Sequence, residues 1–550
     1  MKGKSLNGNN YGFQLTIKEL LNGPRQSAGS QEIIYRNKMR YTYNDLFERI
    51  NRLGSALAGL GVKKGDTVAV FDYDSHRYLE SFFAIPMMGA VLFTVNWRLS
   101  PDQIEYTMNH AEADVVLINT DFLPLLGSIW SKLKSVKKVI ILSDSDELPK
   151  TDMAYDGEYE ALLSAASADF DFPDLDEDTK ATTFYTTGTT GLPKGVYFTH
   201  RQIVLHAMSV CIAVSGHDSP LRFSTSDVYM PITPMFHVHA WGFPFIATMM
   251  GVKQVYPGKY EPEMLIKLIV QEKVTYSHCV PTILQMLVAS PIAKKIDLSA
   301  WKVIIGGARL SKGLAMAGIE LGIQIMTGYG MSETCPVISV SNLKPSMKHY
   351  NNEQKSDIAI KTGMPITLVD VKIADPSGKF LPNDGRTTGE IIVRAPWFTK
   401  GYYKDAEKTE ELWRGGWLHT GDVGYMDQDG YIQITDRLKD VIKTGGEWVS
   451  SLDLENAISL HNAVQEAAAI GIPDSKWGER PMLLVMLTPQ FRGDGITPEV
   501  LKGHMKSCAD QGKIPRYAIP DQYIITDEIP KTSIGKVDKK RLRAIYVNVA

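Results

Sequence analysis

The chain has 550 residues, of which 22% are charged and 44% hydrophobic, and its formal net charge is −3. This length allows roughly three to four compact units, and the composition is that of a globular protein. The slight negative charge argues against a nucleic-acid partner held by a basic surface, so any phosphate must be bound locally. The four cysteines are Cys211, Cys279, Cys335 and Cys508. They lack paired spacing, which favours a reducing compartment and argues against a disulfide framework or a zinc site.

Neither the first residues of the sequence nor its most apolar stretch predicts a secretory signal or a membrane span. Residues 1–11 are polar and rich in glycine and asparagine, so no secretory signal is visible. Residues 82–95 are the most apolar, but they contain Pro86 and Gly89 and are too few to cross a bilayer. We therefore expect a cytoplasmic protein without a membrane span.

Helical and strand-like patterns alternate along the first part of the chain. Apolar residues recur at helical spacing from Leu46 to Leu60, Gly61 ends the pattern, and residues 67–71 resemble a strand. Further short apolar runs occupy residues 274–280, 303–305 and 323–326. The last two end in glycine-rich turns, as buried strands beside a ligand crevice do. The pattern indicates an α/β fold.

Residues 185–195 contain three glycines, four threonines and one lysine. Glycines let backbone N–H groups approach phosphate oxygens, hydroxyls add donors or magnesium ligands, and Lys194 adds a positive charge. A flexible turn is the alternative interpretation. The Walker loop is excluded, because Leu192 and Pro193 separate Gly191 from Lys194. The segment predicts a polyphosphate loop of another kind, and hence a nucleotide-using enzyme.

The sequence on either side predicts how this loop is held. Residues 181–185 and 196–198 are β-branched or aromatic, which favours two strands joined as a hairpin. Thr199 and Gln202 then have the spacing of a capping box, so we expect a helix over the apolar residues that follow.

A second domain is predicted after about residue 436. Residues 452–458 resemble a helix, residues 463–472 and 481–488 resemble strands, and Thr497 precedes a proline that suits the first turn of another helix. The junction at residues 436–440 is strongly charged, which favours an exposed hinge over a packed element.

Four further segments accompany the phosphate loop, at residues 328–334, 420–422, 436–440 with 445–448, and 530–536. Each alone is a common turn or surface stretch. Together with the loop, in this order, they resemble the acyl-adenylate-forming superfamily of acyl-CoA synthetases, firefly luciferases and peptide-synthetase adenylation domains, over nearly the whole chain. Residues 236–241, 436–440 and 445–448 are most similar to bacterial medium- and long-chain fatty acyl-CoA ligases.

This resemblance implies a large N-terminal domain of mixed sheets and helices at 1–435, a hinge at 436–440 and a small, mobile α+β C-terminal domain at 441–550. It also implies that the chain uses ATP, Mg²⁺ and coenzyme A, and that its partner is a small carboxylic acid. A homodimer is possible. In the implied chemistry, a carboxylate attacks the α-phosphorus of ATP, pyrophosphate leaves, and CoA then displaces AMP from the acyl-AMP. Charge grows on phosphate oxygens, so cations and fixed donors should dominate catalysis.

The resemblance also assigns roles by position. Thr186 and Glu333 hold magnesium, since a hydroxyl and a carboxylate are suitable hard ligands, and Lys536 bridges the substrate carboxylate and the α-phosphate. A surface lysine is the alternative for Lys536, because it lies in a Lys/Arg-rich tail. The other implied nucleotide-binding residues are Thr187, Gly188, Thr189, Thr190 and Lys194 at the β- and γ-phosphates, Gly307, Ala308, Thr327, Gly328 and Tyr329 at adenine, Thr334 at the α-phosphate, Asp422 with Arg437 at the ribose, and Ser332 without a more specific role.

Lys439 is the implied pivot of the hinge, with Lys443 and Trp448 as contacts from the C-terminal domain. Two half-reactions that share one site but need different neighbours give a reason for domain rotation. Relatives often carry aspartate at the pivot, and the lysine here matches the long-chain branch.

On the acyl side, the resemblance makes His237 an organiser beside the carboxylate and Trp241 a gate to an apolar tunnel, with Val238 between them. The alternatives are a buried core histidine and a packing tryptophan. Relatives that activate amino acids have aspartate where this chain has His237, which argues against an amino-acid substrate.

The resulting hypothesis is an AMP-forming fatty acid–CoA ligase that prefers medium or long chains. A short or sulfur-containing acid such as 3-(methylthio)propanoate is the alternative within the same chemistry. A luciferase-like oxygenase and a peptide-synthetase loading enzyme are alternatives of other classes. The short distance from Lys536 to Ala550 leaves no room for a carrier domain, which argues against the loading enzyme.

Overall fold

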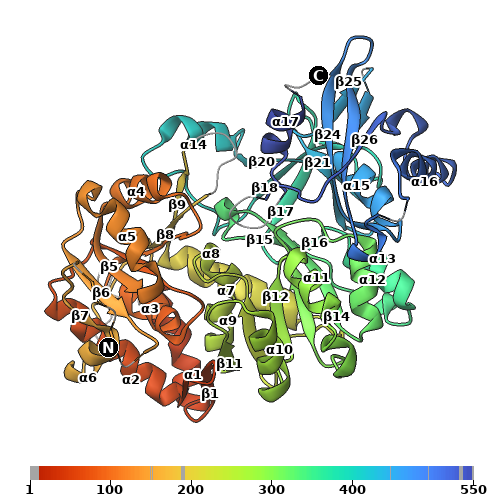
Figure 1. Ribbon diagram of the computed structural model, residues 1–550. Helices are drawn as coiled ribbons and strands as arrows, with labels where there is room; N and C mark the ends of the chain where they lie inside the picture. Colours follow the sequence, from red (N-terminus) through yellow and green to blue (C-terminus); the bar gives the residue numbers. More distant parts are fainter. Residues whose placement is uncertain are drawn as a thin grey trace.

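The computed structural model describes residues 12–547 apart from 146, 149, 152, 187–191, 446, 494 and 532–536. Two large sheets with their helices form a large N-terminal α/β part, and a small sheet with three helices forms a C-terminal part (Figure 1). The predicted fold class is therefore confirmed.

One large sheet has seven strands, which are parallel apart from the β8–β9 hairpin. β3 is buried at every position, as expected of a continuous apolar strand in a parallel sheet. The order is β7 (Gly157–Glu158), β6 (Lys138–Leu142), β5 (Ala113–Asn119), β3 (Thr67–Phe71), β4 (Val91–Thr94), β8 (Lys180–Tyr185), β9 (Gly195–Thr199).

The other large sheet has nine strands and a parallel centre, with antiparallel pairs at both ends. Its order is β16 (Met364–Pro365), β15 (Val337–Val340), β14 (Gln324–Gly330), β13 (Lys302–Ile305), β12 (Tyr276–Cys279), β10 (Val228–Ile232), β11 (Lys253–Tyr256), β1 (Glu32–Tyr35), β2 (Met39–Thr42).

Two five-stranded sheets complete the fold. The first contains β17 (Asp370–Ala374), β18 (Gly389–Arg394), β20 (Trp417–Met426) and β19 (Trp413–Arg414), with β21 (Ile432–Arg437) beside β20. The second, in the C-terminal part, contains β23 (Glu447–Val449), β22 (Ile442–Thr444), β25 (Gly478–Leu487) and β24 (Val464–Asp474), with β26 (Gln522–Ile525) beside β25.

The helices are α1 (Asn22–Ser27), α2 (Tyr43–Gly59), α3 (His76–Met87), α4 (Pro101–His110), α5 (Leu123–Ile129), α6 (Tyr159–Ala165), α7 (His200–Ser215), α8 (Val238–Trp241), α9 (Phe243–Met249), α10 (Pro262–Gln271), α11 (Pro281–Ala289), α12 (Lys312–Glu320), α13 (Asn352–Ala359), α14 (Ala406–Leu412), α15 (Ser451–Ser459), α16 (Pro498–Asp510) and α17 (Lys539–Tyr546).

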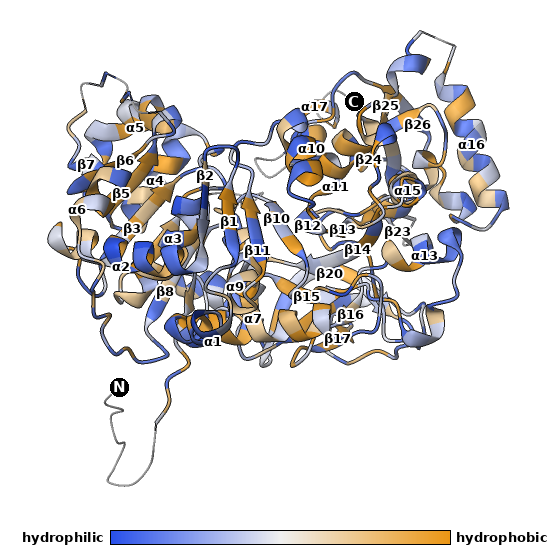
Figure 2. Cartoon of the chain, turned by 90° about the horizontal axis from the view of Figure 1, so that it is seen from below, coloured by the Kyte–Doolittle hydropathy of each residue, from blue (hydrophilic) through white to orange (hydrophobic). Residues whose placement is uncertain are grey.

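Local sequence signals explain several of these elements. The predicted helix after Thr199 is α7, and Thr199 and Gln202 form the expected capping box. The apolar stripe of α2, which includes Leu46, Ile50 and Leu53, is buried. In the C-terminal part, α16 shows hydrophobic and hydrophilic patches side by side (Figure 2), as an amphipathic helix does when it covers a sheet.

The C-terminal sheet is buried on both faces. Along β24, Ala469 belongs to one apolar cluster, whereas its neighbours Ala468 and Ile470 belong to another. Because side chains of a strand alternate between its faces, the two clusters lie on opposite sides of the sheet. This part of the chain therefore has hydrophobic cores of its own.

Two segments differ from the sequence-based expectation. The strand at residues 323–326 continues as β14 through Gly330, because Gly328 and Tyr329 pair with β15. The charged junction is not wholly exposed: Asp436 is 2% exposed and accepts a hydrogen bond from Ser451 N at 2.7 Å. Exposure begins at Leu438.

All four cysteines are free thiols, and Cys279, Cys335 and Cys508 are buried. Burial raises the pKa of each of the four thiols, Cys211 included. Their thiolate forms are therefore disfavoured at neutral pH.

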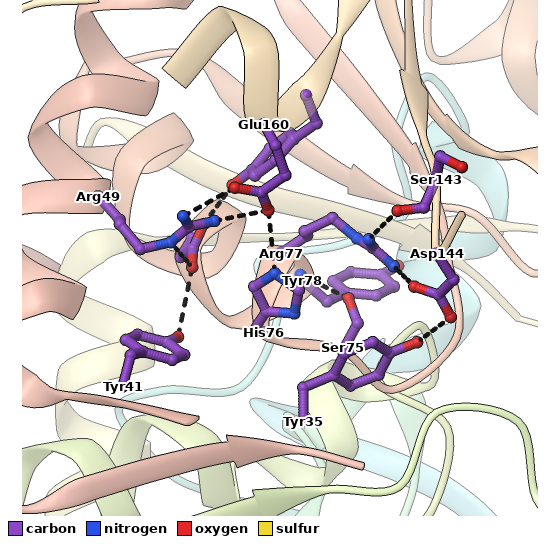
Figure 3. A network of polar contacts seen from close by, with 12 residues as sticks. Tyr35, Tyr41, Arg49, Ser75, His76, Arg77, Tyr78, Ser143, Asp144 and Glu160 are labelled. Carbon is purple, nitrogen blue, oxygen red and sulfur yellow. Dashed lines mark hydrogen bonds and ion pairs between the residues drawn. The ribbon is translucent and has the colours of Figure 1, made fainter. Parts of the chain in front are cut away.

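A partly buried ion-pair network joins α2, α3 and α6 (Figure 3). Arg49 Nε donates to Glu80 Oε1 at 2.7 Å, and its two terminal nitrogens donate to Glu160 at 2.8 Å each. The Glu80 side chain is fully buried, and the Tyr159 hydroxyl donates to it at 2.6 Å. A buried carboxylate depends on such partners, because water cannot reach it.

Replacing Arg49 with methionine should lower the free energy of unfolding by about 3–5 kcal/mol, since Glu80 would stay buried without its cation. Urea denaturation measures the change. Arg386→Met is the matched control, because the Arg386 side chain is 88% exposed and its surface pair with Asp384 should contribute little to stability. Equal effects of the two substitutions would contradict the prediction.

Candidate active site

A cavity of about 940 Å³ lies where the strands β13 and β14 end, and residues from the C-terminal part also line it. Its position outside the carboxyl ends of parallel strands is the usual place for a ligand in α/β proteins. The predicted site residues that line it are Thr186, Lys194, His237, Val238, Trp241, Gly307, Ala308, Thr327, Gly328, Tyr329, Ser332, Glu333, Asp422, Arg437 and Lys439.

Asp422 is the centre of a charged cluster in this cavity. The Tyr329 hydroxyl donates to Asp422 Oδ2 at 2.7 Å, and Arg437 Nε donates to Oδ1 at 3.1 Å. Burial and the Asp422 carboxylate raise the pKa of Tyr329, so its hydroxyl remains a donor. Asp422 and Arg437 face each other across the β20–β21 pair.

The phosphate loop leaves the hairpin β8–β9 as predicted. Thr186 N donates to the Lys194 carbonyl oxygen at 2.9 Å, which closes the neck of the loop. Thr187, Gly188, Thr189, Thr190 and Gly191 lie outside the described residues, so their predicted phosphate contacts stay a prediction.

Glu333 lies near this neck in a short 3₁₀ turn after β14, and it is 7% exposed. The Tyr402 hydroxyl donates to Glu333 Oε1 at 2.6 Å, while the Lys194 ammonium lies 4.5 Å from the centre of the Tyr402 ring. Burial and the Glu333 carboxylate raise the pKa of Tyr402. One tyrosine thus contacts both charged groups.

Glu333 and Thr186 fit magnesium only if a bound nucleotide supplies further ligands. In the described ranges, no group of three or more histidine, cysteine, aspartate or glutamate side chains could hold a metal ion. Magnesium is normally bound by one or two carboxylates together with substrate phosphates and water. The buried Glu333 carboxylate and Thr186 line one cavity together with Lys194, and this set of groups suits such a mode of binding.

Thr334, unlike Glu333, does not line the cavity. It is fully buried, and its hydroxyl donates to the carbonyl oxygens of Met331 and Pro336. The side chain therefore holds the turn that carries Glu333, and a contact to the α-phosphate stays a prediction.

The side of the cavity lined by Val238 and Trp241 contains an unusual backbone. Val238, His239, Ala240 and Trp241 have φ values from 48° to 58°, which form a left-handed turn. Such a conformation costs about 1–2 kcal/mol per residue, so packing must hold it. The Trp241 ring lies against Gly306, where an added Cβ would approach it to 2.8 Å.

Contacts on the preceding residues hold this turn. Met235 N donates to the buried Asp74 at 2.8 Å, and the Phe236 carbonyl oxygen accepts from Thr94 at 2.8 Å. Burial raises the pKa of Asp74 to about 8. His237, which follows directly, is half-buried and lines the cavity.

The predicted residues of the C-terminal part are Lys443, Trp448 and Lys536. Lys443 is exposed, and its backbone N donates to Glu479 Oε2 at 2.9 Å. Trp448 is described only by its backbone, which pairs with Lys443 between β22 and β23. Lys536 lies outside the described residues. The roles of all three stay predictions.

Sequence reasoning missed Tyr402 and Arg309. Arg309 donates twice to Asp453 Oδ1, at 3.2 Å, and so joins the loop after β13 to α15 of the C-terminal part. Its position directly after Gly307 and Ala308 was the available signal. The sequence around Tyr402 contained no such signal, because a tyrosine after a glycine is common in loops.

Among the described residues, every helix is too short or too polar to cross a bilayer.

Gly330 should not tolerate a side chain, because an added Cβ would overlap the Pro336 carbonyl oxygen. We expect Gly330→Ala to displace the turn of Glu333 and to weaken ATP binding at least tenfold, measured by calorimetry. Gly503→Ala is the control, since nothing lies within 4 Å of that added Cβ in α16. Alanine there should stabilise the helix by about 1 kcal/mol. Equal ATP affinity in both variants would contradict the prediction.

Comparisons with known proteins agree with this geometry. Residues 24–403 match the AMP-binding enzyme family, and residues 453–536 match the AMP-binding enzyme C-terminal domain. A long-chain-fatty-acid–CoA ligase of Thermus thermophilus is 39% identical over 97% of this chain and 96% of its own. A 3-methylmercaptopropionyl-CoA ligase of Ruegeria pomeroyi is 36% identical over 91% of both chains.

The fold is also that of solved adenylate-forming enzymes. The crystal structure of the anthranilate CoA ligase AuaEII in complex with anthranoyl-AMP has a TM-score of 0.84 and covers 97% of this chain and 98% of its own, at 24% identity. The sequence thus matches both domains of the family, and the fold of the whole chain matches that of a solved structure. The chain belongs to the AMP-binding enzyme family.

Proposed function

We propose that the chain is an AMP-forming acid–CoA ligase that activates a monocarboxylic acid with an apolar tail, with medium or long chains preferred. One observation carries the proposal: a single cavity joins the polar groups around Asp422 and Glu333 to an apolar part. The apolar part is lined by Val210, Val238, Phe243, Ile304, Val337 and Val340.

The polar part suits the nucleotide. Asp422, which is held by Tyr329 and Arg437, would accept hydrogen bonds from the ribose hydroxyls, and Gly307 and Ala308, which line the same cavity, would border adenine. Glu333 and Thr186 would hold magnesium, which supplies charge neutralisation on the phosphates when bound. Lys194 contributes a fixed positive charge at the neck of the loop.

His237 lines the same cavity as the polar groups and the apolar residues. Its segment is anchored by Asp74 and Thr94, so the side chain is placed before the substrate binds. We assign it the role of an organiser of the acid.

We also infer that the chain divides into a domain at 1–435, a hinge at 436–440 that pivots at Lys439, and a domain at 441–550. The two separate family matches and the separate cores of the C-terminal sheet support this division. In the rotated orientation, Lys443 and Trp448 would face the acyl-AMP.

A sulfur-containing short acid is the second candidate. The relative from Ruegeria is named for 3-methylmercaptopropionate and is nearly as similar as the long-chain ligase, at 36% against 39% identity. Both acids have an apolar tail, so the lining of the cavity is compatible with either.

Pyrophosphate release, measured across chain lengths with and without CoA, tests the proposal. We expect release that depends on the acid, and transfer of ¹⁸O from labelled acid into AMP. Light emission or oxygen consumption would indicate a luciferase-like enzyme instead. If no carboxylic acid supports release, or if AMP never acquires the label, the ligase assignment is wrong.

Lys536→Ala should lower the rate of acyl-AMP formation by roughly a hundredfold or more, because a charge partner of the transition state is lost. Preformed acyl-AMP should still react with CoA at nearly the original rate. Single-turnover assays of the two half-reactions separate these effects. An equal loss in both would contradict the assigned role.

Trp241→Ala should change the acyl-chain preference and leave the ATP requirement unaltered, since the indole closes the apolar part against Gly306. Ratios of kcat/KM over acids of increasing length measure the preference. Trp130→Ala is the control, because Trp130 is 37% exposed and lies away from the cavity. If the acyl-chain preference is unchanged, Trp241 does not act as a gate.

A further inference from the structure

The segment 399–403 joins the two sides of the proposed phosphate site. Thr399 N donates to the Glu333 carbonyl oxygen at 2.9 Å, and Tyr403 N donates to the Gly195 carbonyl oxygen at 2.8 Å. Tyr402 itself pairs with Val196 in an antiparallel bridge. The segment therefore connects the turn of Glu333 to the first residues of β9, directly after Lys194.

The Tyr402 side chain lies between an anion and a cation. Its hydroxyl donates to Glu333 Oε1 at 2.6 Å, and its ring centre lies 4.5 Å from the Lys194 ammonium. A cation attracts an aromatic ring at distances below about 6 Å. All three side chains line the same cavity.

The backbone of Tyr402 is fixed independently of these two contacts. Tyr402 N donates to Thr409 Oγ1 at 2.9 Å, and Thr409 belongs to α14. Gly401 lies so close to Thr409 that an added Cβ would overlap it. Trp413 Nε1 donates to the Thr399 carbonyl oxygen at 3.1 Å. The tyrosine is thus placed by the fold and does not depend on a ligand.

We propose that Tyr402 is a positioning residue for magnesium-bound ATP. Its hydroxyl orients the Glu333 carboxylate through Oε1, which leaves the second oxygen for the metal, and its ring holds the Lys194 ammonium beside the phosphate loop. Partners that orient a metal ligand commonly change metal affinity by about 10- to 100-fold when removed. This inference rests on the proposed function, because that function makes Glu333 a metal ligand.

The test measures ATP binding by isothermal titration calorimetry, without acid or CoA, over a series of MgCl₂ concentrations and in EDTA. Tyr402→Phe keeps the ring and removes the hydroxyl. We expect it to raise the MgCl₂ concentration for half-maximal ATP binding by about tenfold or more and to leave binding in EDTA unchanged. Tyr402→Leu removes the ring too, and should also weaken binding in EDTA.

Tyr403→Phe is the matched control. The Tyr403 ring contacts Lys180 and His110, and the residue does not line the cavity. It should bind ATP as the unchanged protein does. Equal magnesium dependence of Tyr402→Phe and Tyr403→Phe would overturn the proposal, as would general unfolding of Tyr402→Phe by circular dichroism.

A double substitution tests the route through Glu333. Glu333→Gln alone should raise the magnesium requirement, and adding Tyr402→Phe should shift it little further, because both changes remove one coupled interaction. A full second shift would overturn the proposal. Because binding is measured without acid, a failure here leaves the ligase function standing. Conversely, a chain that shows the expected binding but forms no acyl-CoA refutes the ligase function alone.

Discussion

The buried carboxylate of Asp422 holds together the polar part of the cavity, where we propose that the nucleotide binds. It accepts hydrogen bonds from Tyr329 at the end of the nine-stranded sheet and from Arg437 at the end of β21. Asp422 and Arg437 lie opposite each other in one sheet, whereas Tyr329 belongs to another, so the Tyr329–Asp422 hydrogen bond links the two sheets. The same contacts orient the carboxylate oxygens of Asp422, so these oxygens are already oriented when the chain has folded.

A protein of net charge −3 must gather positive charge locally to bind a polyanion. Lys194 comes from the hairpin of the seven-stranded sheet, Arg437 from β21, and Lys439 from the segment that leads to the C-terminal part, yet all three line one cavity. Arg309 is engaged differently, since it pairs with Asp453 of α15. The cavity is therefore built at the junction of the sheets, where no single element supplies enough charge.

Elements with a strong local signal were predictable from the sequence. β3 has the expected bounds, and α7 begins at the expected capping box, because these features depend on neighbouring residues alone. Motif residues such as Asp422 and Glu333 were found through family resemblance, and they do share a cavity. Their roles stay proposals.

Features that depend on distant contacts could not be predicted. The left-handed turn at Val238–Trp241 contains four residues that normally avoid this conformation, and it is held by Asp74 and Thr94 from far along the chain. Asp436 was expected in an exposed hinge, but its carboxylate is covered by Ser451. Tyr402 acquires its importance only when α14 places it beside Glu333.

The state of the four cysteines has a practical meaning for a protein proposed to consume a thiol. Burial keeps these sulfurs protonated, and the thiolate is the form that attacks an activated acyl group. If the proposed ligase function holds, the folded chain would protect the mixed anhydride from attack by its own thiols, and CoA would have no internal competitor. A colorimetric thiol reagent added to the native protein should accordingly report the disappearance of CoA against a low background.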